Sequence, residues 1–265
     1  MRTYDVQPHL GRHLVLDPRT LDYRRPYVGQ TLHTADWEPA LPVLDQTNLL
    51  TQGVRTSLLF HGVDDVDVLG ACNAGTAALA AILTAEEAKA AGLDTTDPVA
   101  AEEFAIELYA AATTCDQWHD LTWPSQDCGS SSLGVAQALK ARGLIDQYGT
   151  GTTAAELCAL LQTGPVAMGM PWHDAFTNAT EHALLDDLTG WEDTPVMGGH
   201  AVCVTALEQI GRDETGSLVP ARTIVRVRNS WGTTFGDHGS FRMSLDVYQR
   251  LRREIDLIQF RRNPR

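Results

Sequence analysis

The chain has 265 residues, 43% of them hydrophobic, and it carries a formal net charge of −14. This length and hydrophobic content permit a sizeable buried core, so we expect one large folded domain or two lobes that share a cleft. The acidic balance argues against nucleic-acid binding and against unaided docking on anionic membranes, because both depend on Lys and Arg.

The N-terminus and the cysteines bear on the cellular compartment. The N-terminal sequence contains charge and proline where a secretory signal needs an apolar run, and no later stretch approaches about 18 apolar residues. We therefore expect a soluble, cytoplasmic protein with no membrane partner. The five cysteines are an odd number, so at least one is free and a disulfide framework is not expected.

Residues 1–40 are predicted to form an extended N-terminal segment that wraps the surface. Four prolines interrupt this segment, and it has no sustained hydrophobic period. We place the start of the main domain, 41–265, directly after it.

Helical patterns dominate the next part of the chain. Apolar residues from Ala74 to Leu83 recur at helical spacing, which predicts a helix that starts near Gly70. Capping-box or Asp-Pro start signals predict three further helices, and a fourth ends at a glycine. These predicted helices begin at Thr84, Asp97, Ser132 and Thr153.

After Pro165 the pattern changes to short β-rich runs at 166–170, 201–205, 223–228 and 255–260. Helices grouped before strands predict an α+β protein of two lobes, and they argue against a doubly wound sheet. We place a helical lobe at about 69–163 and a β-rich lobe at about 164–261. An enlarged hairpin is expected over residues 209–220.

Three motifs supply the residue types that nucleophilic catalysis needs. Cys72 opens a helix, where unpaired amides and the helix dipole lower a thiol pKa. His200 lies between a diglycine and an apolar strand, and the ordinary pKa of imidazole suits proton transfer near neutrality. Asn229 ends a strand, where it can accept from the second imidazole nitrogen, and Trp231 can shield that bond from water. The motifs are Leu69-Gly-Ala-Cys-Asn-Ala74, Gly198-Gly-His-Ala-Val-Cys203 and Arg228-Asn-Ser-Trp-Gly232.

Each motif alone has an ordinary structural explanation. A single cysteine in an alanine-rich helix is usually a small core residue, and a histidine beside glycines is more often a loop or core residue. Asn-Ser before Trp-Gly could simply form a turn. The joint occurrence of the three motifs, in the order Cys, His, Asn, favours the catalytic interpretation.

Together these motifs resemble the papain-like cysteine peptidases, over roughly residues 41–245. The Asn-Ser-Trp-Gly signature and the glycine-preceded His-Ala-Val are intact. The resemblance implies the papain-like two-lobe fold, with an active site in the cleft between the lobes, and a peptidase that acts on a polypeptide or peptide substrate. It assigns Cys72 as nucleophile, His200 as general base and Asn229 as the residue that orients the histidine.

The resemblance also implies an oxyanion donor, which is a glutamine several residues before the nucleophile. Val66 stands six residues before Cys72 and cannot donate. The run Leu41-Pro-Val-Leu-Asp-Gln46 resembles the segment that carries this glutamine, so we expect Gln46 to be the donor and Thr47–Val68 to be an insertion. If Gln46 is an ordinary surface residue instead, the oxyanion hole relies on backbone amides alone.

The resemblance further implies residues that bind substrate. The loop around Gly129 and Ser130 is similar to the glycine-containing loop that pairs with the substrate backbone, although Ser130 replaces its usual second glycine. Met168 and Met170 resemble the strand that lines the main specificity pocket, which would favour Leu, Val or an aromatic residue two positions before the cut. Two core methionines on a buried strand are the alternative. Trp231 completes the set of expected substrate-binding residues.

Other features of the sequence add no further site. Cys128 is expected to be reduced, or at most paired with Cys115. The remaining histidines have no zinc-type spacing and no phosphate-binding glycine loop occurs, so we assign no metal and no cofactor.

Three functions remain open. The first is a peptidase, with a murein peptide hydrolase as a variant; the second is an acyl transferase that uses the same three residues; the third is a catalytically weak binding or assembly module. Titration of the active-site thiol separates the third from the others. Competition between water and an added amine for the acyl group separates the first two.

Overall fold

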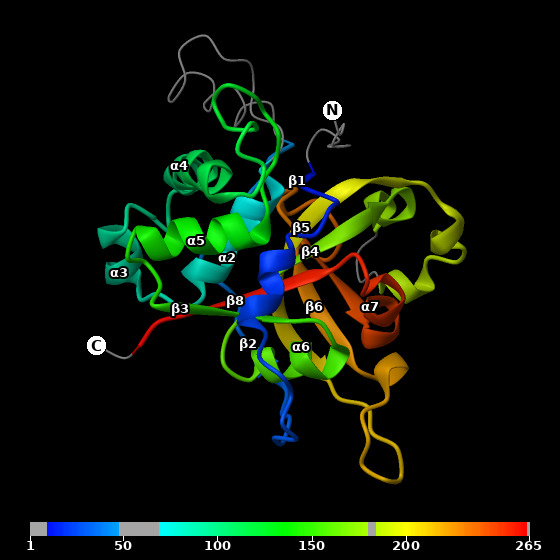
Figure 1. The fold of residues 1–265 in the computed structure, drawn as a ribbon. Coiled ribbons are helices and arrows are strands. Elements are labelled where there is room, and N and C mark those ends of the chain that lie inside the picture. Colours follow the sequence, from blue (N-terminus) through cyan, green and yellow to red (C-terminus); the bar gives the residue numbers. More distant parts are fainter. Residues whose placement is uncertain (1–9, 48–68, 180–183, 264–265) are drawn as a thin grey trace.

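The computed structural model describes residues 10–47, 69–179 and 184–263. Its centre is an antiparallel sheet with strand order β3-β8-β4-β5-β6-β7, and β1 and β2 also pair with β5 (Figure 1). The strands are β1 (Gly11–Arg12), β2 (Ala35–Asp36), β3 (Gln147–Gly151), β4 (Val166–His173), β5 (Val196–Gln209), β6 (Ile224–Arg228), β7 (Ser240–Ser244) and β8 (Asp256–Arg261).

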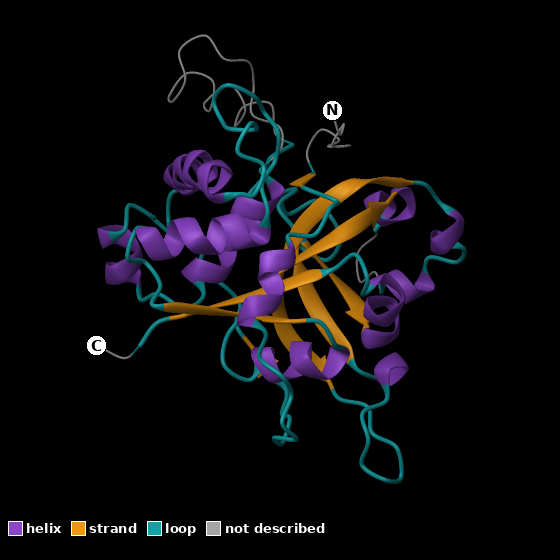
Figure 2. Ribbon diagram, in the orientation of Figure 1, coloured by secondary structure: helices purple, strands orange, loops and turns teal. Residues whose placement is uncertain are grey.

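The helices gather in two places around this sheet. They are α2 (Gly70–Ala80), α3 (Ala85–Ala90), α4 (Pro98–Cys115), α5 (Ser132–Ala141), α6 (Ala154–Leu161) and α7 (Leu245–Leu251), with short 3₁₀ turns such as η1 (Pro18–Tyr23) between elements. One hydrophobic cluster joins α2, α4 and α5, and a second joins the central strands with α6 and α7. Figure 2 shows one group of helices at the left of the sheet and the others at its right and below it. This grouping is the expected α+β architecture.

The local signals that predicted the helices have their expected geometry. Thr84 and Thr153 each form a complete capping box, at the starts of α3 and α6. Asp97 caps α4 through its side chain, and a proline occupies the first turn. Short-range side-chain to backbone bonds therefore account for where these helices begin.

Two elements lie outside the lobe to which the sequence assigned them. β3 and α6 fall within 69–163, the expected helical lobe, yet β3 pairs with β8 and α6 packs in the cluster of the sheet. The sequence of β3, QYGTG, has no alternating apolar pattern, so periodicity does not reveal it. Pairing with the C-terminal strand β8 makes it a strand.

Only part of the N-terminal segment lies on the surface. Leu10, Arg12 and His13 are almost completely buried. Residues 10–13, called the arm below, enter the interface between α2 and β5, where β1 pairs with β5 (Figure 1). The predicted surface location is therefore wrong for the arm, because its backbone hydrogen bonds are made inside the protein.

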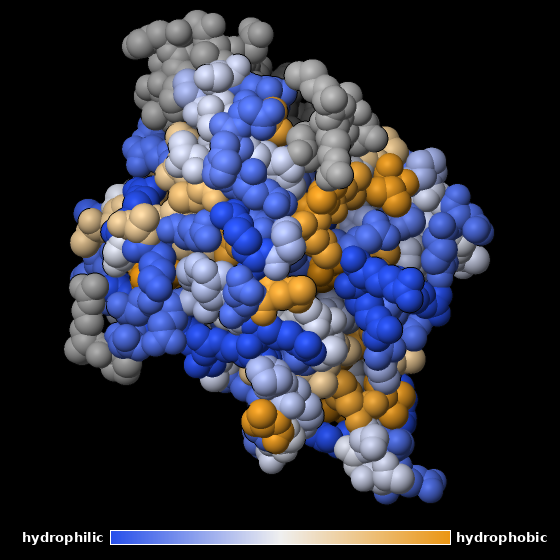
Figure 3. Space-filling view, in the orientation of Figure 1, coloured by the Kyte–Doolittle hydropathy of each residue, from blue (hydrophilic) through white to orange (hydrophobic). Residues whose placement is uncertain are grey.

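The view in Figure 3 shows how polar and apolar residues are distributed over one face of the protein. This face is largely hydrophilic, with separate apolar areas between the hydrophilic ones. Among the described residues, no helix combines the length and apolar character needed to cross a membrane.

Candidate active site

Cys72 lies in the first turn of α2, which begins at Gly70 and packs against β5. Its side chain is completely buried, and its sulfur lies 3.4 Å from Oγ of Ser130. Burial raises the pKa of the Cys72 thiol far above its usual value, although the contact with Ser130 opposes this. The expected thiolate is therefore not favoured in this state, because desolvation outweighs the helix dipole.

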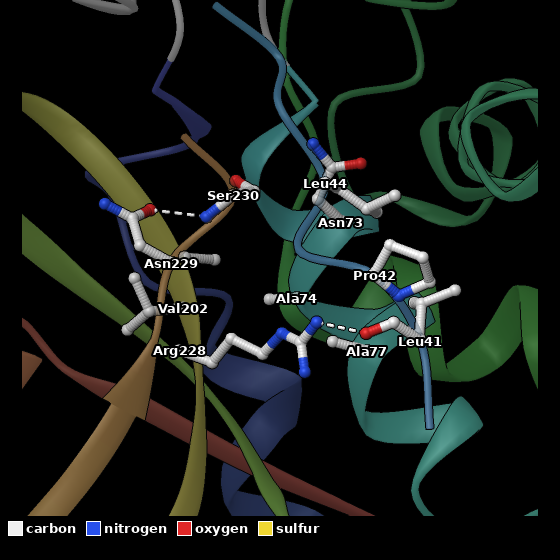
Figure 4. Close-up of a pocket in the computed structure, with 11 residues that line it drawn as sticks. Leu41, Pro42, Leu44, Asn73, Ala74, Ala77, Val202, Arg228, Asn229 and Ser230 are labelled. Carbon is white, nitrogen blue, oxygen red and sulfur yellow. Dashed lines mark hydrogen bonds between the residues drawn. The ribbon is translucent and has the colours of Figure 1, made fainter. Parts of the chain in front are cut away.

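His200 lies in β5 and has a partner on each ring nitrogen. Nε2 lies 2.7 Å from Oδ1 of Asn229, and Nδ1 lies 2.9 Å from the carbonyl oxygen of Leu10. The Asn229 oxygen also accepts from the backbone N–H of Ser230 at 2.8 Å, which sets the orientation of the carboxamide (Figure 4). The contact with Asn229 holds the imidazole as expected for an orienting residue.

Both partners of His200 are hydrogen-bond acceptors. The two contacts are satisfied together only when both ring nitrogens carry hydrogen, which is the imidazolium form. Burial lowers the pKa of His200, and the bonds to Asn229 and Leu10 act in the opposite direction. The neutral ring can therefore serve only one of the two acceptors at a time.

Two tryptophans enclose the imidazole. The Trp231 ring stacks on His200, with centroids 5.1 Å apart and an interplanar angle of 27°. Trp172 of β4 meets the ring edge-on at 4.9 Å. Because the two tryptophan rings exclude water, they lower the local dielectric and strengthen the hydrogen bond between His200 and Asn229. Trp172 was not singled out in the sequence, because the predicted β-rich run ended at residue 170, before Pro171, and a single tryptophan beyond it carries no catalytic signal.

Gln46 is completely buried, and in the folded chain it bonds residues of two motifs, the one that contains Cys72 and the one that contains Asn229. Its Oε1 accepts from Nδ2 of Asn73 at 2.9 Å and from Oγ of Ser230 at 2.8 Å. Asn73 follows Cys72 and Ser230 follows Asn229 in the sequence. Two donors hold the oxygen of the amide, so its nitrogen is directed elsewhere. Gln46 is therefore not an ordinary surface residue.

The chain before Gln46 is anchored to β6. Arg228 donates hydrogen bonds to the carbonyl oxygens of Leu41 and Pro39, and Figure 4 shows this segment beside α2, across from β6. Of the predicted insertion Thr47–Val68, residues 48–68 lie outside the described residues. The bond between Gln46 and Asn73 brings the two flanks of that segment together.

The loop that carries Gly129 and Ser130 is positioned by Tyr109 of α4. The Tyr109 hydroxyl accepts from the backbone N–H of Cys128 at 2.9 Å and of Gly129 at 2.8 Å, and it donates to Asp127 at 2.9 Å. Gly129 has a φ of +76°, in the left-handed region that favours glycine. Tyr109 was missed because its place in the helical pattern of α4 predicts only a core residue.

The same loop binds the backbone of the arm. The N–H of Ser130 donates to the carbonyl oxygen of Gly11 at 3.1 Å, and its carbonyl oxygen accepts from the N–H of His13 at 3.4 Å. These are backbone contacts of the kind expected between this loop and a substrate. The arm therefore occupies the position where Gly129 and Ser130 were expected to hold a peptide.

On its other side the arm lies against β5 and the start of α2. Gly11 and Arg12 pair with His200 and Gly199. A Cβ at Gly70 would lie only 1.8 Å from the Leu10 carbonyl oxygen and 2.8 Å from Nδ1 of His200, so only glycine permits this approach. The Leu10 carbonyl thus lies between the imidazole and the turn that leads to Cys72.

Met168 and Met170 do not line the site. Both are completely buried in the hydrophobic cluster of the sheet. Side chains alternate along a strand, so Gly169 between them faces the opposite side, where a Cβ would meet Asp256 and Arg12. The prediction of an apolar pocket lined by these methionines is wrong, because they face the core.

All five cysteines are free, so Cys115 and Cys128 do not pair. Within the ranges that the structure describes, no group of three or more His, Cys, Asp or Glu side chains is placed to hold a metal ion.

No protein-family model and no curated protein matches the chain. Among solved structures, xylellain, a cysteine protease from Xylella fastidiosa, aligns over 100% of this chain and 99% of its own, with 15% identity and a TM-score of 0.54. Procathepsin L 3 from the larval midgut of Tenebrio molitor aligns over 96% of this chain and 76% of its own, with 13% identity and a TM-score of 0.48. A stem bromelain precursor aligns over 97% and 78%, with 13% identity and a TM-score of 0.49. The chain therefore has the papain-like α+β fold that its three motifs predict.

Proposed function

We propose that the chain is a cysteine-type peptidase that hydrolyses peptide bonds through a thioester acyl-enzyme. One observation carries this proposal. His200 joins Asn229 through Nε2, and its Nδ1 faces the turn of α2 that leads to Cys72. This geometry supports a site that joins nucleophile, base and orienting residue, although 128 and 29 residues separate them along the chain.

Catalysis begins when the arm leaves. Without the Leu10 carbonyl, Nδ1 of His200 takes the proton of the Cys72 thiol, and returning solvent removes the burial that raises the thiol pKa. The thiolate attacks the peptide carbonyl carbon, and the C–N bond breaks as His200 returns the proton to the leaving amine. Water, deprotonated by His200, then hydrolyses the thioester and restores the thiol.

Gln46 and the backbone N–H of Cys72 stabilise the oxyanion in both halves of the reaction. The Gln46 oxygen is held by Asn73 and Ser230, and the proposed role assigns the amide nitrogen as the donor to the reacting carbonyl. A positioned amide donor of this kind is worth about 10²–10³ in rate. The donor is held before substrate binds, so no reorganisation is needed.

The test uses the full-length chain, a peptidyl epoxide and a peptide library. The epoxide should alkylate Cys72, and Cys72→Ala and His200→Ala should abolish cleavage while the circular dichroism spectrum stays unchanged. Asn229→Ala should cost less, because this residue orients but does not react. Cys115→Ala is the matched control and should keep full activity.

Cleavage that survives in Cys72→Ala would refute the mechanism. The acyl transferase is tested by adding an amine: products that carry the amine in place of water, formed at millimolar amine, would favour it over the peptidase.

A further inference from the structure

The side chain of Arg12, in the arm, is buried next to the candidate active site. Its side chain is 2% exposed, and Nη2 lies 2.6 Å from Oδ1 of Asp256, the first residue of β8. The backbone of Arg12 pairs with Gly199, the neighbour of His200. An arginine that lies beside the base therefore ends at a carboxylate inside the protein.

Gly169 makes the space for this side chain. A Cβ at this position would lie 2.4 Å from Nε and 3.0 Å from Cδ of Arg12, and 2.1 Å from the Asp256 carboxylate. Gly169 and Asp256 are paired residues of β4 and β8. The floor of the space is thus bare backbone with a carboxylate at its end, and any larger residue at 169 would fill it.

We propose that this space, the acidic pocket of Gly169 and Asp256, binds a basic side chain of the peptide substrate, and that Arg12 is its intramolecular occupant. The inference rests on the proposed peptidase function and names its substrate class. The arm already takes the backbone contacts expected of a substrate, through Ser130 on one side and β5 on the other. A peptide that replaces the arm therefore meets the pocket with one of its side chains.

The contacts of Arg12 also say which basic groups fit. Nη2 has the carboxylate as its partner, whereas Nη1 is buried and has no hydrogen-bond partner among the described residues. The pocket thus offers one acceptor to one donor and does not use the full fork of a guanidinium. A single ammonium can satisfy the same carboxylate, so lysine should bind as well as arginine. The net charge of −14 also attracts cationic peptides.

The test separates binding from cleavage. The full-length chain carries Arg12→Gln, which removes the cation of the arm, and Cys72→Ser, which prevents cleavage. The probes are fluorescein-labelled alanine–glycine octapeptides with one arginine, one lysine or one citrulline, moved through each position. Citrulline keeps the shape of arginine without its charge. Fluorescence anisotropy measures the Kd of each peptide.

At one position, the arginine and lysine peptides should bind on the order of 10- to 100-fold more tightly than the citrulline peptide, the usual range for a hydrogen bond to a charged group. Asp256→Asn should remove this preference, and Asp246→Asn, which changes a partly exposed carboxylate on α7, should keep it. Equal binding of the three peptides, a preference that survives Asp256→Asn, or no binding of any peptide would overturn the pocket.

Cleavage by the Arg12→Gln chain with intact Cys72 is measured in parallel. Tight binding of arginine peptides that are never cut would refute the proposed peptidase function and leave the pocket standing. Cleavage that is indifferent to arginine, lysine and citrulline would refute the pocket and leave the peptidase function standing.

Discussion

Replacing Arg12 with alanine should release the arm. The substitution removes a buried charge-assisted hydrogen bond, 2.6 Å long, between Arg12 and Asp256. Such a bond contributes about 1.5–3 kcal/mol, so the free energy of arm opening should fall by about that amount. Each 1.4 kcal/mol is a factor of ten, so the open population should rise about 10- to 150-fold.

The rate of Cys72 alkylation reports this opening, because the thiol is completely buried while the arm is closed. Sub-stoichiometric iodoacetamide and mass spectrometry of the labelled cysteine give that rate in Arg12→Ala and in wild type. Arg250→Ala, which removes an exposed arginine on α7, is the matched control and should leave it unchanged. An alkylation rate in Arg12→Ala within twofold of wild type would refute the reasoning that this ion pair holds the arm closed.

Three further predictions concern the oxyanion donor, the pH response of the arm and the methionines. Gln46→Ala should lower kcat by about 10²–10³ with little change in KM, because its contact strengthens in the transition state; steady-state kinetics on a peptide substrate would contradict this if KM alone changed. Burial, and then the charge of Arg12, lower the pKa of His13 from 6.5 to about 4. His13 therefore binds a proton more readily when the arm is released, and the closed form loses stability as the pH falls from 6.5 to about 4. Hydrogen exchange of the arm amides should show faster opening toward pH 4 in wild type than in His13→Gln, and identical profiles would contradict this prediction. Met168→Leu should leave substrate preference unchanged, because this side chain faces the core; a shifted cleavage profile in the peptide library would place it at the site after all.

The His13→Gln variant is needed to isolate the pH response of His13, because Asp116 changes the stability of the closed arm in the opposite direction. Asp116 lies 3.8 Å from His13, and burial raises the pKa of its carboxyl to about 7. With the arm closed, the Asp116 carboxyl therefore keeps a proton that a solvated carboxyl loses above about pH 4. Protonation of Asp116 thus stabilises the closed form as the pH falls. Comparing wild type with His13→Gln at each pH leaves the Asp116 contribution common to both proteins.

Local chemistry was predictable where short-range interactions decide the outcome. The starts of α3, α4 and α6 follow from side chains that bond to backbone within a few residues. That Cys72, His200 and Asn229 form one site stays a prediction from the three motifs, and the bond between His200 and Asn229 supports it. Gln46, identified from a displaced motif, lies beside Asn73 and Ser230 at that same site.

The elements that were missed depend on distant partners. β3 has no apolar alternation and becomes a strand through its pairing with β8, and the methionines of β4 were assigned to the wrong face. A strand pattern shows that alternate residues share a face, but not which face meets the core when both faces are buried. Gly169, the residue that faces Arg12, therefore carried no signal of its own.

The fold class, the helix starts and the three motif residues of the candidate site could be predicted from the sequence, because each is encoded by neighbouring residues or by a recognisable motif. The state of that site depends on the folded protein. The Arg12–Asp256 pair joins residues 244 positions apart, and the Leu10 carbonyl oxygen is the hydrogen-bond partner of Nδ1 of His200. Burial raises the pKa of the Cys72 thiol, whereas a helix start would lower it. Desolvation and long-range pairing depend on what the folded chain places around a group, and no local pattern contains that information.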